Sequence, residues 1–178
     1  MAWVIAIVGS LAGFLFGYDE GIIAGTLPLI KDHFTLSNSQ VSTMTSALPF
    51  GALFGSMIIG AVLASRLVTK FGRKKCLILS GCFFIFGAIT ASTAPADWVL
   101  VLARFILGIA IGSAAVTTPL YLSESAPAEH RGAMIAVYQL AVSIGIVCAY
   151  LANYFFIEHL SWRLMFATCA IPAFIMVL

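Results

Sequence analysis

Two carboxylates lie near the middle of a long apolar segment at the start of this 178-residue chain. Asp19 and Glu20 stand inside the run from Ala2 to Ile30, which at about 1.5 Å per residue is long enough to span a bilayer as a helix. An ionised Asp at the centre of a spanning helix costs about 2.5–3.5 kcal/mol. Asp19 therefore indicates either a proton-carrying site or a carboxylate that is buried and paired for structural reasons.

Arg104 is the natural counter-charge for Asp19, because it too lies inside an apolar run and a charge there should seek a partner. If the two residues pair, the carboxylate stays ionised. Loss of the Arg charge would make protonation easier, because the neutral acid is less costly to bury. Such a switch is what coupling to protons requires. In the alternative, Arg104 extends its guanidinium towards the outer membrane surface, since Trp98 begins its segment.

Two further side chains could contact a ligand inside the membrane. The amide of Gln139 offers two donors and an acceptor, which suits a polyhydroxylated ligand; the alternative is a hydrogen bond between helices that serves packing. Phe16 lies three residues before Asp19 and could stack against the apolar face of a sugar ring, although its sequence position alone favours a core residue.

The composition excludes most other classes of protein. The chain is 62% hydrophobic and 9% charged, whereas soluble domains are about 25% charged. We therefore expect an integral membrane protein. The sequence contains no nucleophile–base arrangement, phosphate-cradling loop or cluster of metal-ligand spacing, so we expect no catalytic residues, no metal and no enzymatic activity. No basic tract large enough for a nucleic-acid partner is present.

Six apolar segments position these residues, and we expect each to be a helix. They cover residues 2–30, 41–63, 76–94, 98–122, 133–157 and 164–178, the last being short for a span. The loops after the second and fourth segments hold six of the nine basic residues, whereas the loops after the first, third and fifth hold two. The positive-inside rule therefore predicts a cytoplasmic N-terminus.

Glycine spacing predicts how the first segment packs. Glycines at positions 13, 17, 21 and 25 share nearly one helix face, which lets another backbone approach closely, and Asp19 points roughly away from that face. Part of the pattern recurs 91 positions later: Gly17, Gly21 and Pro28 reappear as Gly108, Gly112 and Pro119. This recurrence predicts two three-helix units of opposite topology, which together form an inverted repeat.

The two basic loops carry complementary charges. Lys70 and Arg73 lie in the loop after the second segment, and Glu124 and Arg131 lie in the loop after the fourth. Salt bridges between them could close the cytoplasmic ends of the helices in one state and break in another. The alternative is that these charges only set the topology.

These residues resemble the signatures of the sugar porter family of the major facilitator superfamily, and of bacterial proton-coupled hexose symporters in particular. The resemblance extends along nearly the whole chain. Its motifs are Phe16-Gly17-Tyr18-Asp19-x-Gly21, Gly72-Arg73-Lys74, Arg104-x-x-x-Gly108, Pro119-x-Tyr121-x-Ser123-Glu124-x-Ala126-Pro127-x-x-x-Arg131-Gly132, Gln139-Leu140 and Trp162-Arg163.

The resemblance implies an all-α membrane protein that is the N-terminal six-helix half of a twelve-helix fold, with the C-terminal half as its partner. It implies secondary active transport of a monosaccharide, a hexose or pentose, coupled to protons by alternating access across a bacterial inner membrane. The proton is the coupling ion, and no cofactor is expected. A proton-independent uniporter of a sugar or polyol, and a sugar sensor or assembly partner that does not transport, are alternatives on the same fold.

The resemblance also assigns roles to single residues. It implies proton coupling by Asp19 and Arg104, and sugar contacts from Gln139 and Phe16. A cytoplasmic charge network would use Lys70, Gly72, Arg73, Glu124 and Arg131.

Overall fold

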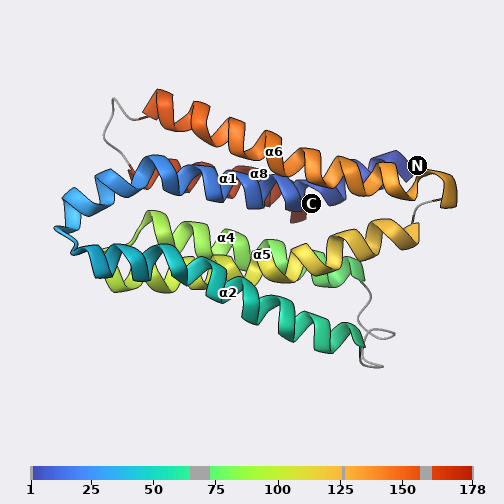
Figure 1. Cartoon of the computed structure of the whole chain (residues 1–178), viewed down its shortest axis with the longest axis horizontal. Helices are drawn as coiled ribbons and strands as arrows, with labels where there is room; N and C mark the ends of the chain where they lie inside the picture. The colour runs from blue at the N-terminus through green and yellow to red at the C-terminus, as the bar shows by residue number, and fades with distance from the viewer. Residues whose placement is uncertain (1, 65–72, 126, 157–161, 178) are drawn as a thin grey trace.

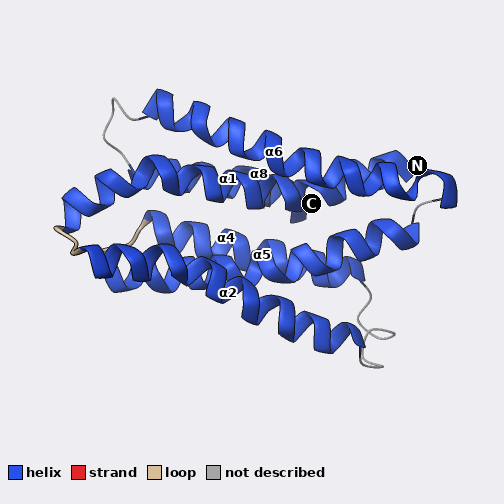
Figure 2. Cartoon of the chain, viewed as in Figure 1, coloured by secondary structure: helices blue, strands red, loops and turns tan. Residues whose placement is uncertain are grey.

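Every regular element of the described chain is a helix (Figure 2). The computed structural model describes residues 2–64, 73–125, 127–156 and 162–177. The expected all-α fold is therefore confirmed. Four helical stretches in these ranges are long and apolar enough to cross a membrane, and they are Asn38–Ile58, Lys75–Ser92, Asp97–Glu124 and Arg131–Phe155. A shorter apolar stretch follows at Trp162–Val177.

The first helix, α1 (Ala2–Phe34), continues beyond the apolar run that suggested an end at residue 30. The polar residues after Ile30 remain helical, and Thr35 ends the helix with a positive φ of 50°. The Leu36 N–H then bonds the Lys31 carbonyl at 3.0 Å, which is the 6→1 bond of a Schellman motif. The end of α1 is thus set by backbone capping and not by hydropathy.

The second helix, α2 (Asn38–Ala64), begins before the expected residue 41 for a similar reason. Ser37 and Gln40 form a capping box, in which each side chain accepts a hydrogen bond from the backbone N–H of the other residue, at 2.9 Å and 3.4 Å. Such a box satisfies two donors that a helix start leaves free. The polar residues 38–40 therefore belong to the helix.

The middle helices lie close to their expected positions, with ends that differ by up to three residues. They are α4 (Arg73–Ser92), α5 (Asp97–Ser125) and α6 (Arg131–Phe156), and a short 3₁₀ helix, η1 (Ala128–His130), precedes α6. The sixth apolar segment, expected as one helix over 164–178, is divided at Cys169 into α7 (Trp162–Thr168) and α8 (Ala170–Val177).

The helices form two tightly packed pairs, α1 with α6 and α2 with α5, while α4 packs on α5, α7 and α8 (Figure 1). Glycine makes the tight pairing possible. A Cβ placed on Gly17 would overlap the Val142 carbonyl oxygen of α6, and one placed on Gly112 would overlap the Ala52 carbonyl oxygen of α2. The glycine face of the first segment therefore packs against a backbone, as its spacing predicts.

The two pairs are related by the internal repeat. The Phe14 carbonyl oxygen of α1 lies against Gly145 of α6, and Phe105, 91 positions after Phe14, places its carbonyl oxygen against Gly51 of α2. Figure 1 shows that α1 and α5 run in opposite directions. The same contact is therefore made twice with opposite topology, which is the signature of an inverted repeat.

Candidate functional site

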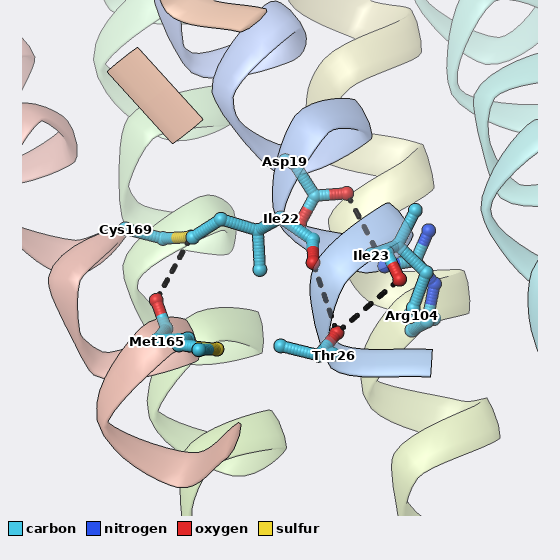
Figure 3. A network of polar contacts seen from close by, with 7 residues as sticks. All are labelled: Asp19, Ile22, Ile23, Thr26, Arg104, Met165 and Cys169. Carbon is cyan, nitrogen blue, oxygen red and sulfur yellow. Dashed lines mark hydrogen bonds and ion pairs between the residues drawn. The ribbon is translucent and has the colours of Figure 1, made fainter. Parts of the chain in front are cut away.

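Asp19 and Arg104 meet in the middle of the bundle (Figure 3). Arg104 Nη1 of α5 lies 3.4 Å from Asp19 Oδ2 of α1. The two side chains are 1% and 0% exposed respectively, so the guanidinium does not extend to the membrane surface. Because the glycines on one side of α1 pack on α6, the Asp19 side of the same helix is directed towards α5.

The pair holds two opposite charges at close range with few hydrogen bonds. Both carboxylate oxygens of Asp19, and Nε and Nη1 of Arg104, have no hydrogen-bond partner among the described residues. In a medium of low dielectric constant each charge then depends on the other for compensation. Protonation of Asp19 would leave the guanidinium without its counter-charge, so the protonation state of one residue controls the electrostatic free energy of the other.

The break between α7 and α8 forms another part of the surroundings of Asp19. Cys169 is fully buried, and its thiol is close enough to Asp19 to interact with it electrostatically. Tyr18 contacts the same break, with its hydroxyl 2.9 Å from Thr168 Oγ1. Tyr18 therefore bonds the sixth segment directly, while Asp19, the next residue of α1, lies between this break and Arg104 of α5.

Asn153 of α6 forms a hydrogen bond with the backbone of α1 close to the Asp19–Arg104 pair. Its Nδ2 donates to the Gly21 carbonyl at 2.9 Å, and its side chain occupies the space that a side chain at Gly25 would need. Sequence reasoning did not select Asn153, Tyr18 or Thr168 as functional candidates. Their contacts join residues more than 130 positions apart, and a single sequence gives no signal for such pairs.

The two expected ligand contacts lie on the α1–α6 pair. Gln139 of α6 is exposed in the described chain, directly after Tyr138, whose carbonyl lies against Gly13. Phe16 is half-buried and packs against the buried hydrophobic residues of the core. The structure places Gln139 and Phe16 on neighbouring helices, and their roles in ligand binding stay predictions. Glu20, next to Asp19, is exposed.

The expected cytoplasmic network lies largely outside the described side chains. Lys70 and Gly72 fall outside the described residues, and Arg73 is the first residue of α4. Glu124 at the end of α5 and Arg131 at the start of α6 are both exposed. The network therefore stays a prediction.

The sequence matches known proteins over almost its full length. The family model described as sugar (and other) transporter matches residues 5–178. The galactose-proton symporter of Escherichia coli K12 is 41% identical over 178 residues, which are 100% of this chain and 37% of the relative. The D-xylose transporter of Levilactobacillus brevis is 40% identical over 166 residues, 93% of this chain and 35% of the relative. The chain thus spans little more than a third of these relatives.

Solved structures show the same arrangement of helices. The xylose transporter of Escherichia coli in an inward-open conformation superposes with a TM-score of 0.88 at 26% identity, covering 99% of this chain and 46% of that one. A proton:xylose symporter bound to 6-bromo-6-deoxy-D-glucose superposes with a TM-score of 0.83 at 28% identity, covering 99% and 43%. The described helices therefore correspond to one half of a larger transporter fold.

Proposed function

Because the chain belongs to the sugar transporter family of the major facilitator superfamily, we propose that it forms the N-terminal half of a monosaccharide–proton symporter that works by alternating access. The observation that carries this proposal is the buried pair of Asp19 and Arg104, held in the middle of the bundle at 3.4 Å. A pair of this kind is expensive to bury and supplies the titratable group that proton coupling needs.

The proton would bind a carboxylate oxygen of Asp19 from the outer side. The bound proton neutralises the carboxylate and so removes its electrostatic attraction for Arg104, which remains cationic. The N-terminal and C-terminal halves of the complete protein can then close around the sugar and open to the cytoplasm. There Asp19 loses the proton and pairs with Arg104 again. An inward-negative membrane potential assists the step that carries the positive charge, by about 2.3 kcal/mol per charge per 100 mV.

The sugar would lie between the two halves near the membrane midplane. Gln139 is exposed on α6, as a residue facing such a cavity should be, and its amide can both donate to and accept from sugar hydroxyls. Phe16, on the adjoining helix, would offer an apolar ring face. Relatives named for galactose, arabinose and xylose support a hexose or pentose as the substrate class.

The membrane orientation is part of the proposal. Six basic residues in the loops after the second and fourth apolar segments, against two in the other loops, support a cytoplasmic N-terminus. The bacterial relatives support an inner membrane. In this orientation the cytoplasmic charge network of Lys70, Arg73, Glu124 and Arg131 would lie on the inner side.

The test is sugar-driven proton uptake by the complete protein in de-energised membrane vesicles. Addition of galactose, xylose or arabinose should make the external medium more alkaline, and a protonophore should abolish the signal. Equilibration of sugar without a pH change would contradict symport and indicate a uniporter. Absence of uptake and exchange for every sugar offered would contradict transport and indicate a sensor or assembly partner.

A further inference from the structure

The sixth apolar segment breaks beside Asp19, and proline explains the break. Pro172 has no N–H, so it cannot bond the Thr168 carbonyl four residues earlier. Cys169, between α7 and α8, bonds its N–H to the Phe166 carbonyl, three residues back, at 3.1 Å. The Met165 carbonyl instead accepts the Thr168 hydroxyl at 2.6 Å and lies 3.9 Å from Cys169 Sγ.

The hydrogen bonds at the break have a definite direction. A Thr hydroxyl has one proton, and the geometry assigns the Thr168 proton to the Met165 carbonyl. Thr168 Oγ1 must then act as the acceptor for Tyr18, whose hydroxyl lies 2.9 Å away. A chain of two hydrogen bonds therefore runs from Tyr18 through Thr168 to Met165, and it joins α1 to the break from the residue that precedes Asp19.

Cys169 and Arg104 lie on opposite sides of Asp19 (Figure 3). The ionisable and charged groups near the carboxylate are therefore Arg104 from α5, Cys169 from the break and Glu20 on α1 itself. The Asp19 side chain is fully buried and its oxygens have no hydrogen-bond partner among the described residues, so packing of the surrounding side chains keeps this carboxylate out of contact with solvent.

We propose that Tyr18 and Thr168 are positioning residues for proton coupling. Their hydrogen bond holds the α7–α8 break against α1 and closes the side of Asp19 that faces away from Arg104. The inference rests on the proposed function, since it takes Asp19 as the carboxylate that carries the proton. Without the bond, the break separates from α1 and water reaches the carboxylate. Asp19 then exchanges protons without sugar, and coupling is lost while sugar exchange continues.

The test compares the proton-to-sugar ratio with sugar counterflow in vesicles containing the complete protein. Tyr18→Phe and Thr168→Val each remove one hydroxyl at nearly constant shape, and Thr168→Ser retains the hydroxyl. The controls are Tyr154→Phe on α6 and Thr43→Val on α2, because both side chains are exposed. Tyr18→Phe and Thr168→Val should lower the ratio about three- to tenfold, as loss of one hydrogen bond allows, with counterflow retained.

The double variant and the Ser variant make the expectation specific. Tyr18→Phe/Thr168→Val should be no worse than Thr168→Val alone, because the bond that Tyr18→Phe removes is already lost in Thr168→Val. Thr168→Ser should behave as the wild type. An unchanged ratio in both single variants, or additive losses in the double variant, would overturn the inference. Loss of counterflow together with coupling would show that the bond only maintains the fold, which also overturns it.

The proposed function and this inference fail in different ways. If the wild type takes up no protons with sugar, symport is wrong, and the positioning role falls with it. If the wild type couples normally and the Tyr18 and Thr168 variants do so as well, only the positioning role is wrong.

Discussion

At the scale of single residues, the stability of the bundle depends on a buried ion pair, and removal of either charge alone should destabilise the protein. Asp19 and Arg104 are almost completely buried and 3.4 Å apart. Removal of one member of such a pair leaves an uncompensated charge in a low-dielectric interior, whereas removal of both charges does not. Measurements of unfolding free energy on single and double variants can therefore distinguish the effect of an unpaired buried charge from the effect of losing the ion pair as a whole.

Arg104→Gln should lower the free energy of unfolding by about 3–5 kcal/mol, because it leaves the Asp19 carboxylate without a counter-charge. Asp19→Asn/Arg104→Gln should recover most of the loss, since the double variant buries no charge. Thermal unfolding of the complete protein in detergent measures both effects, with Lys75→Gln at an exposed position as the control. An Arg104→Gln protein as stable as the wild type would show that the pair is not a buried ion pair in the membrane protein.

Sequence reasoning could predict this pair because charges in apolar segments are rare and need partners. Asp19 and Arg104 both lie in apolar segments, and the structure brings them together. Tyr18, Thr168 and Asn153 could not be selected in the same way. Hydroxyl and amide groups are common in membrane helices, and their partners here depend on helix packing that one sequence does not specify.

At the scale of elements, glycine faces determine which helices approach most closely. The α1–α6 and α2–α5 pairs both place glycine against the backbone of the partner helix. An added Cβ must push the helices apart, and overpacking of this kind costs about 1–3 kcal/mol. That cost outweighs the gain of about 0.8–1.0 kcal/mol in helix propensity that Ala has over Gly.

Gly17→Ala and Gly112→Ala should both lower the thermal unfolding temperature, because each new Cβ overlaps a carbonyl oxygen of the partner helix. Gly132→Ala is the matched control, since no atom of the described residues lies within 4 Å of the position of its Cβ, and it should not destabilise the protein. Equal effects of the three substitutions on thermal unfolding would mean that the close approach of the helices is not what the glycines provide.

Hydropathy predicted the long helices well but not their ends. The capping box of Ser37 and Gln40 is visible in the sequence as a Ser-x-x-Gln pattern, so the start of α2 could have been found. The break at Cys169 follows from Pro172, a helix-breaking residue within the sixth segment. Apolarity alone gave a single helix there, because it does not register the missing backbone donor.

At the scale of the whole molecule, the chain has the architecture of one half of a transporter of its family. The inverted repeat was predictable from spacings in the sequence, and the paired contacts of Phe14 and Phe105 with glycine confirm it. The second half of the relatives lies beyond the region that this chain matches. For that reason the sugar and the gating contacts cannot be derived from these residues alone.

The proposed orientation predicts which loops face the outside. In a cysteine-free background, Ser39→Cys, at the start of α2, should react with a membrane-impermeant maleimide in intact cells. Glu129→Cys, in η1 at the other end of the bundle, should react only after the inner membrane is permeabilised. Both positions are exposed, so access to the reagent and not burial decides the result. The reverse labelling pattern would contradict a cytoplasmic N-terminus.

A comparison of the wild type with Asp19→Asn shows whether Asp19 carries the coupled proton. Wild-type and Asp19→Asn proteins are placed in vesicles, and sugar-driven proton uptake and sugar counterflow are measured on the same preparation. Asp19→Asn should still exchange sugar but take up no protons, because its amide cannot be protonated at the site. Sugar-driven proton uptake by Asp19→Asn equal to that of the wild type would show that Asp19 does not carry the coupled proton.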